Sequence, residues 1–158
     1  QPALLDRLTD HEPHLRTERP DAVFVNESRL REALLRDLGW LLNARDAWDH
    51  VEMEGLEHVQ RSVINYGMPP LAGQLLSELD WGHVERSIRE SILAFEPRIL
   101  PKTLAVTLLA STEQLTHHNT LQFEIRCQFW SMPYPLELLL KTSLDLETGQ
   151  VSLQNLRA

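Results

Sequence analysis

Apolar residues recur at helical spacing in the first third of the chain. Between residues 28 and 43 an apolar residue returns every three or four positions, and charged side chains fill the opposite side. The apolar positions are Leu30, Ala33, Leu34, Leu38, Leu41 and Leu42. Asn26 or Ser28 can cap the first turn, because a short polar side chain there accepts a hydrogen bond from a free amide. The pattern predicts a long amphipathic helix that buries its leucine face.

A second helical pattern covers residues 81–95. Asp80 is the expected N-cap, and Leu79 and Val84 on either side of it have the spacing of a hydrophobic staple. The expected buried stripe consists of Val84, Ile88, Ile92 and Phe95. The segment between the two helices, residues 43–59, is mixed and acidic, which indicates a loop with a short helical turn.

The first 26 residues differ in character from the rest of the chain. Three leucines that follow Pro2 indicate a short helix: Leu4, Leu5 and Leu8. Residues 9–26 are polar and carry two prolines, which is typical of an irregular or flexible connection. We therefore expect residues 1–26 to form a short helix and a flexible connection, and residues 27–158 to form a single α+β domain.

The hydrophobic period changes from helical to alternating after residue 97. Residues 121–129 alternate apolar and polar side chains, as expected for a half-buried strand. Further strands are expected over three ranges: 103–109, 136–146 and 150–156. Glu147-Thr148-Gly149 indicates a hairpin turn before the last of them. The fold class is therefore α+β, with N-terminal helices packed against a mostly antiparallel β-sheet formed by the C-terminal half.

Composition and charge narrow the functional classes. The chain has 158 residues and a net charge of -8, which disfavours sequence-independent binding to nucleic acid and docking on anionic lipid. Cys127 is the single cysteine, so no intrachain disulfide forms and a reducing compartment fits. No apolar run reaches the length of a membrane span, and the expectation is a cytoplasmic protein. The sequence begins at Gln1, which leaves a removed leader open.

The tripeptide Glu96-Pro97-Arg98 is the main candidate site. A proline disfavours helical geometry in the residue before it, so the second helix should end by Phe95 or Glu96. A carboxylate there meets the negative end of the helix dipole. If the segment is extended, Glu96 and Arg98 point to the same side. The pair is either a surface ion pair that stiffens a turn or a fixture that holds a partner.

Two aromatic positions are candidate contacts for a partner. Tyr66 lies in a turn, Asn65-Tyr66-Gly67, which is either a rigid connection or a shaped interface loop. Trp130 falls on the polar side of its strand and is a candidate contact for a neighbouring subunit. Trp40 and Trp81, by contrast, are expected in or near the core, and Cys127 is expected on the buried face of its strand.

No pattern points to catalysis, a metal or a cofactor. Glycoside hydrolysis usually needs two carboxylates with separated pKa values, and a carboxylate beside Arg98 tends to stay ionised. The spacing of His11 and His14 across a proline is not a metalloprotease motif. His117 and His118 fall in a polar loop and are expected to be solvated.

Two stretches of the chain carry a resemblance to a known family. Ser62-Val63-Ile64-Asn65-Tyr66-Gly67-Met68-Pro69-Pro70-Leu71-Ala72-Gly73 and Phe95-Glu96-Pro97-Arg98-Ile99-Leu100 resemble the TssE family. These are small baseplate subunits of the bacterial type VI secretion system, similar to the lysozyme-like wedge proteins of contractile phage tails. Segments near both ends also resemble the family: 4–10, 35–43 and 142–149. One departure is Pro70, where the family pattern has an acidic residue.

The resemblance implies structural assembly without an enzymatic step. It implies a place in the cytoplasmic baseplate near the inner membrane, with the wedge proteins TssF and TssG, sheath subunits and other baseplate proteins such as TssK as partners. Glu96, Pro97 and Arg98 match the family's assembly motif and are the implied partner contacts, joined by Tyr66. A strand edge in the sheet is expected to engage the sheath. The alternatives are a lysozyme-like peptidoglycan hydrolase and a phage-derived tail baseplate protein.

Overall fold

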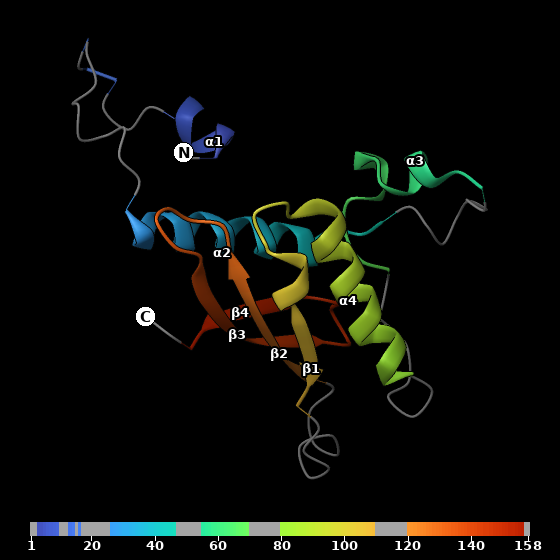
Figure 1. Cartoon of the computed structure of the whole chain (residues 1–158). Helices are drawn as coiled ribbons and strands as arrows, with labels where there is room; N and C mark the ends of the chain where they lie inside the picture. Colours follow the sequence, from blue (N-terminus) through green and yellow to red (C-terminus); the bar gives the residue numbers. More distant parts are fainter. Residues whose placement is uncertain are drawn as a thin grey trace. The chain divides into compact units, whose positions relative to one another are not determined.

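Helices come first along the chain and strands come last, as the hydrophobic pattern predicts (Figure 1). The structure is a computed structural model that describes residues 3–9, 13–14, 16, 26–46, 55–69, 80–109 and 120–156. The chain forms two compact units, Gln1–Asp37 and Leu38–Ala158. The predicted division between residues 26 and 27 stays a prediction.

The first unit contains α1 (Leu4–Leu8) and the beginning of α2 (Glu27–Asn43). The predicted short helix is confirmed, but its apolar stripe is exposed, with Leu4 at 69% and Leu8 at 73%. Asp6 of α1 pairs with the Arg36 guanidinium at 2.5 Å. Side-chain hydrogen bonds from Arg36 to Asp6 and Asp37 outweigh desolvation and raise the pKa of Arg36.

Helix α2 follows the predicted leucine pattern. Asn26 caps it, because its side-chain oxygen accepts a hydrogen bond from the Arg29 amide at 2.8 Å. Ser28, the other candidate cap, instead donates its hydroxyl to Glu32 within the helix. Five of the six predicted apolar positions are buried: Ala33, Leu34, Leu38, Leu41 and Leu42. Trp40 lies outside this stripe and is 52% exposed, so its predicted core position is wrong.

Two short helices follow, α3 (Glu57–Gln60) and η3 (Val63–Asn65). Gly67 comes next with a backbone φ of 140°, a value that residues other than glycine rarely adopt. Its carbonyl oxygen accepts a short hydrogen bond from the Ser91 hydroxyl. The backbone of Met68 pairs with Ala44 and Asp46, which joins this segment to the end of α2.

Helix α4 (Trp81–Phe95) confirms the second helical pattern. The Asp80 side chain caps it by accepting a hydrogen bond from the Gly82 amide at 3.0 Å. The helix ends at Phe95, one residue before Glu96, as Pro97 predicts. Its buried side chains are Val84, Ile88, Ser91 and Ile92. Leu79, the predicted staple partner, lies outside the described residues.

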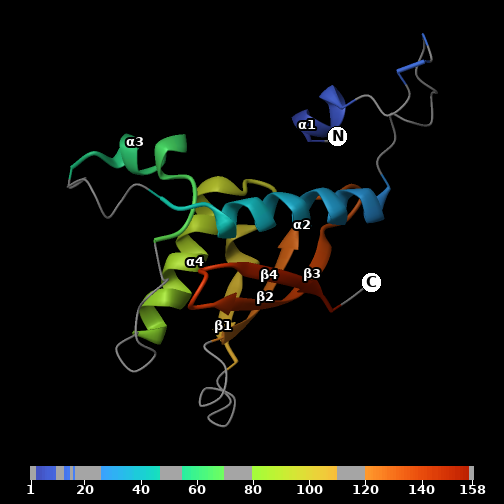
Figure 2. The same ribbon diagram turned by 180° about the vertical axis from the view of Figure 1, so that it is seen from behind.

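The C-terminal half forms an antiparallel sheet in the order β1-β2-β3-β4 (Figure 2). Its strands are β1 (Ala105–Leu108), β2 (Thr120–Phe129), β3 (Leu136–Asp145) and β4 (Val151–Asn155). The first strand begins later than predicted, because Pro101–Thr103 forms a short helix, η4. There the Thr103 hydroxyl accepts a hydrogen bond from the Gln128 amide at 2.9 Å, so a side chain replaces the expected backbone pairing.

One face of the sheet is buried and the other carries polar side chains. The odd residues of β2 and the even residues of β3 oppose each other and supply the core: Leu121, Phe123, Ile125, Cys127, Phe129, Leu138, Leu140 and Leu144. Helix α4 runs beside β1 (Figures 1 and 2). The α+β fold class is therefore confirmed. Among the helices of the described ranges, none has the length and apolar character needed to cross a membrane.

Candidate functional site

The candidate site lies where α4 ends. Glu96 is the C-cap residue of α4 and is only 5% exposed. Its Oε1 accepts hydrogen bonds from the Arg98 amide at 3.2 Å and from Nε of Arg98 at 2.7 Å, while Oε2 accepts one from Nη2 at 2.5 Å. Glu96 and Arg98 do pair, but the segment is a turn, in which the Ile99 amide donates to the Glu96 carbonyl oxygen at 3.2 Å, so the extended geometry expected from the sequence is wrong. We call the segment Glu96–Pro97–Arg98 the hinge.

The chemistry of the hinge depends on Arg98. A carboxylate at the C-terminal end of a helix is disfavoured by the helix dipole, and a buried one also loses hydration. The bidentate guanidinium offsets both costs, because charge-assisted pairs of this geometry are among the strongest hydrogen bonds in proteins. The pair is thus more than a surface ion pair, since the carboxylate lies inside and only the Arg98 side chain, 27% exposed, reaches the surface.

Cys127 lies on the buried face of β2, as predicted, where the charge of Glu96 influences the pKa of its thiol. Burial raises the pKa of the Cys127 thiol to about 12, and the negative charge of Glu96 contributes to the shift. A thiol with this pKa stays protonated at neutral pH. Cys127 is therefore a core residue and carries none of the thiolate character that a nucleophile or metal ligand needs.

Backbone hydrogen bonds fix the hinge to the end of β2. The Trp130 amide donates to the carbonyl oxygen of Arg98 at 2.7 Å, and the Leu100 amide donates to that of Gln128 at 2.8 Å. Between them, Ile99 forms a β-bridge with Phe129. The hinge therefore continues the β1 side of the sheet, so its outer surface is rigid.

Tyr66 joins the hinge through Phe95. The two rings meet edge to face, with centroids 5.4 Å apart and planes inclined at 72°. Tyr66 and the hinge are 30 residues apart in the sequence, yet both lie at the end of α4. The four residues predicted as partner contacts, Glu96, Pro97, Arg98 and Tyr66, are therefore in one region. Their role in binding stays a prediction.

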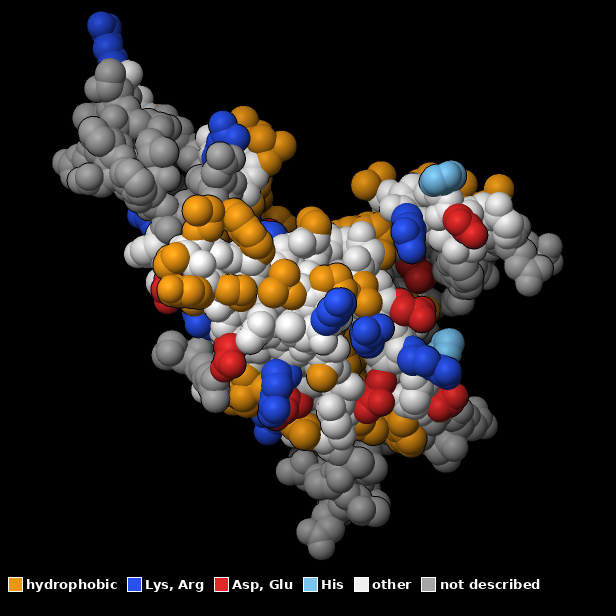
Figure 3. All heavy atoms as spheres, in the orientation of Figure 1, with side chains coloured by type: hydrophobic (Ala, Val, Ile, Leu, Met, Phe, Trp, Pro, Cys, Tyr) orange, Lys and Arg blue, Asp and Glu red, His pale blue; other side chains and the backbone are white. Residues whose placement is uncertain are grey.

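The connection between β2 and β3 begins beside the hinge, where the Trp130 amide binds the Arg98 carbonyl oxygen, and it carries exposed apolar side chains. Trp130 is 54% exposed, as the sequence predicts, and Met132 and Tyr134 are 78% and 76% exposed. Figure 3 shows hydrophobic side chains gathered over this connection. No periodic pattern in the sequence singles out Met132 and Tyr134, although two prolines flank Tyr134 and indicate a rigid loop. We call Pro97, Arg98, Trp130, Met132 and Tyr134 the hinge surface.

The two edges of the sheet are partly occupied by side chains. The hydrogen bonds of antiparallel strands alternate, so every second residue of an edge strand directs its amide and carbonyl outward. On β1 the outward amide of Leu108 donates to Oε1 of Glu85 in α4 at 2.6 Å. On β4 the outward amide and carbonyl of Val151 both bind the side chain of Asn43 at 2.9 Å.

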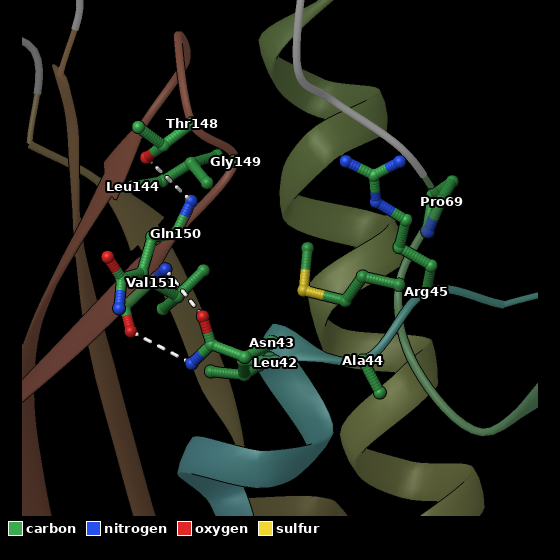
Figure 4. A pocket seen from close by; sticks show the side chains of 11 residues that line it. Leu42, Asn43, Ala44, Arg45, Pro69, Leu144, Thr148, Gly149, Gln150 and Val151 are labelled. Atoms are coloured by element: carbon green, nitrogen blue, oxygen red, sulfur yellow. Dashed lines mark hydrogen bonds between the residues drawn. The ribbon is translucent and has the colours of Figure 1, made fainter.

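A pocket of about 270 Å³ lies next to the start of β4 (Figure 4). Its walls come from the end of α2, the segment at Met68 and the turn between β3 and β4. Asn43 points across it toward Val151, and Arg45 lies on the opposite side. In that turn, Gly149 has a φ of 71°, which confirms the predicted hairpin turn.

The described residues hold no group of three histidine, cysteine or acidic side chains that would bind a metal ion. The histidines weighed as possible ligands, His11, His117 and His118, lie outside those residues. His14 lies within them and is exposed.

Comparison with known protein families gives a match, which ends before β3. The model of the family described as baseplate wedge protein gp25 matches residues 28–134, more than half of the chain. This range includes α2, α4, the hinge, β1 and β2. No curated protein and no solved structure matches the chain. The match confirms the resemblance to baseplate wedge proteins that the sequence indicates.

Proposed function

Because the chain belongs to the baseplate wedge protein gp25 family, we propose that it is a structural subunit of the type VI secretion system baseplate. In this role it binds the wedge proteins TssF and TssG and helps to initiate assembly of the contractile sheath. Its proposed place is cytoplasmic, at the baseplate near the inner membrane, with TssK as a further neighbour. A phage-derived tail baseplate would use the chain in the same way, and neighbouring genes distinguish the two settings.

The observation that carries the proposal is the hinge. Glu96 fixes the orientation of Arg98, so a partner that binds Arg98 loses little side-chain entropy. Arginine, tryptophan, tyrosine and methionine are the residues enriched where protein interfaces bind most strongly. The hinge surface combines one of each on a rigid support. We assign it to the wedge proteins, with Tyr66, whose ring packs against Phe95 at the end of α4, as a further contact.

The sheath contact is proposed at β4. Edge strands recruit a strand from another chain through their outward backbone groups. On β1, α4 lies alongside and Glu85 already holds the Leu108 amide. On β4, the backbone groups of Leu153 point outward by the alternation that begins at Val151. The end of α2 lies beside β4 in turn, where Asn43 binds Val151 and an added Cβ at Gly39 would lie 3.8 Å from Leu153. Both edges are therefore partly covered, and the proposed contact at β4 follows from its place as the last strand of the chain.

We further propose that the chain makes and breaks no covalent bond. A lysozyme-like hydrolase needs a carboxylic acid that is protonated near neutral pH and can reach its substrate. Glu96, the acid of the candidate site, does not meet these needs, because both of its oxygens bind Arg98 and it is almost fully buried. An assay of peptidoglycan cleavage is expected to show no activity, and turnover that depends on an acidic residue of this chain would contradict this part of the proposal.

Co-purification tests the proposed assembly directly. The full chain is co-expressed with TssF and TssG from the same gene cluster, and a tag on the chain is used for capture. The proposal predicts a stable complex that survives gel filtration. If the folded chain binds neither wedge protein when all three are produced in soluble form, the proposed role is wrong.

A further inference from the structure

We propose that Thr103 is a positioning residue for the hinge surface, because its hydroxyl fixes the backbone segment that follows Arg98. The inference rests on the proposed binding of wedge proteins at the hinge surface, and it adds a residue on which that surface depends without being part of it. Thr103 is half-buried at the end of η4 and acts on the hinge through the backbone of Leu100 and Gln128.

Two segments of the chain pair with the same edge of β2. Ala105 of β1 lies opposite Arg126, and just after the hinge Ile99 lies opposite Phe129. In a regular antiparallel pair, two segments of equal length face each other. Here the three steps from Arg126 to Phe129 face six steps from Ala105 back to Ile99. Three extra residues therefore leave the sheet, and they form η4 (Pro101–Thr103).

The backbone of Gln128 binds both ends of this excursion. A residue of an antiparallel strand normally exchanges both of its backbone bonds with one residue opposite. The Gln128 carbonyl oxygen accepts from the Leu100 amide at 2.8 Å, whereas the Gln128 amide donates to the Thr103 hydroxyl at 2.9 Å. That hydroxyl donates in turn to the Leu100 carbonyl oxygen at 2.8 Å. These three bonds form a closed ring, which we call the Thr103 ring, and two of them use one hydroxyl.

The Thr103 ring fixes one end of the segment that follows the hinge. At the other end, the Trp130 amide donates to the Arg98 carbonyl oxygen at 2.7 Å. Ile99, between the two ends, is buried and holds the segment against the core. Arg98 and Trp130 both belong to the hinge surface, so their spacing depends on how tightly this segment pairs with β2.

Loss of the hydroxyl opens the ring but leaves the turn of η4. The half-buried Gln128 amide then loses its partner, which is costly for a donor with little access to water. The Thr103 amide still donates to the Leu100 carbonyl oxygen at 3.0 Å, so we expect the turn to remain. The Leu100 end of the segment gains freedom, and a wedge protein has to order it on binding, which lowers the affinity.

Amide hydrogen exchange on the free chain tests the ring itself. In the wild type we expect the Gln128 amide to exchange as slowly as that of Arg126, which pairs with β1. Thr103→Val should speed exchange at Gln128 and Leu100 by about tenfold or more and leave Ile125, whose amide faces β3, unchanged. A wild-type Gln128 amide that exchanges much faster than that of Arg126 overturns the inference.

Binding to the wedge proteins separates positioning from stability. Thr103→Val should weaken the affinity by about fivefold or more, whereas Thr103→Ser keeps the hydroxyl and should bind like the wild type. Val151→Ala is the control, because it removes part of a buried side chain from β4, on the opposite edge of the sheet. It should lower the free energy of unfolding and leave the affinity unchanged. Surface plasmon resonance measures the affinities, and urea denaturation measures the stabilities.

The outcomes distinguish the inference from the proposed function. If the wild type binds the wedge proteins and folded Thr103→Val binds them equally well, the inference is wrong and the proposed function stands. An equal loss of affinity in Thr103→Val and Val151→Ala also overturns the inference, because lost stability then explains both. If the wild type binds neither wedge protein, the proposed function fails and the inference fails with it.

Discussion

The carboxylate of Glu96 binds the guanidinium of Arg98 with both oxygens, at 2.7 Å to Nε and 2.5 Å to Nη2. The acid is buried and the cation reaches the surface, so the two residues have different tasks. Glu96 orients Arg98 from inside the fold, and Arg98 is the member of the pair that a partner can touch. Substitutions that separate these tasks are the most informative ones.

Trp130 is expected to contribute to wedge binding without supporting the fold. It is 54% exposed beside the hinge, and Trp130→Ala should weaken binding to the wedge proteins by tenfold or more, as for a tryptophan at the centre of an interface. Trp40→Ala is the matched control, because Trp40 is 52% exposed on α2 and outside the hinge surface. Surface plasmon resonance measures the affinity of each variant for the wedge proteins. An equal loss of affinity for both variants would contradict the assignment of the hinge surface.

Gly67 is expected to tolerate no side chain. Its φ is 140°, and a Cβ would lie 2.5 Å from the carbonyl oxygen of Ala44. Gly67→Ala should therefore lower the free energy of unfolding by about 3 kcal/mol or more. At Gly55, with a φ of 79° and no atom within 4 Å of the added Cβ, alanine should cost only about 1 kcal/mol. Urea denaturation measures both, and similar losses would show that the contact with Ala44 is unimportant.

Thr142 holds a buried hydroxyl with no hydrogen-bond partner in the described part of the chain. The residue is 1% exposed on the core face of β3, and its Oγ1 is unsatisfied. Thr142→Val keeps the shape and removes the polar atom, so it should stabilise the fold by about 1 kcal/mol. Thr107→Val on the exposed side of β1 should change stability by less than about 0.5 kcal/mol. Thermal unfolding compares the two, and destabilisation by Thr142→Val would point to a bond that the hydroxyl makes.

Cys127 is expected to make the fold sensitive to alkaline pH. Burial and the charge of Glu96 raise the pKa of the thiol from 9.0 to about 12, so the folded state holds the proton more tightly than the unfolded state does. This contribution to stability is fully present below pH 9.0 and is lost as the pH rises from 9.0 through about 12. The loss is at most about 1.4 kcal/mol per pH unit.

Cys127→Ala separates this effect from other alkaline titrations. The variant should be less stable at pH 7 because of the cavity it leaves, but its free energy of unfolding should fall less steeply above pH 9.0 than that of the wild type. Urea denaturation at several alkaline pH values gives both slopes. Parallel curves for the two proteins would show that the thiol does not titrate differently in the folded state.

The sequence predicts the elements of this fold well because each has a strong local signal. Strict alternation marks β2, the cap at Asp80 marks the start of α4, and Pro97 marks its end. Where tertiary contacts decide, the prediction fails. Thr103 is predicted as a strand residue, yet it ends the short helix η4, and its hydroxyl accepts a hydrogen bond from the Gln128 amide of β2. Trp40 looks like a core residue, yet it lies off the leucine face of α2.

The candidate site shows the same division between local and long-range information. The sequence predicts that Glu96 and Arg98 lie on the same side, but it does so from an extended segment, whereas the structure brings them together in a turn closed by the Ile99 amide. The burial of Glu96 does not follow, because it depends on packing against β2 near Cys127. The contact between Asn43 and Val151 joins residues 108 positions apart and leaves no trace in the local pattern.

The most direct test of the proposed function compares two ion pairs of the same composition and spacing. Glu96→Gln with Arg98→Gln removes the charges of the hinge, and Glu124→Gln with Arg126→Gln removes those of an exposed pair on β2, whose oxygen and nitrogen lie 3.1 Å apart. Both variants are confirmed as folded by circular dichroism and then co-purified with TssF and TssG. We predict that only the hinge variant loses the wedge proteins. Retention of TssF and TssG by the folded hinge variant would contradict the assignment of the hinge as the wedge-binding site.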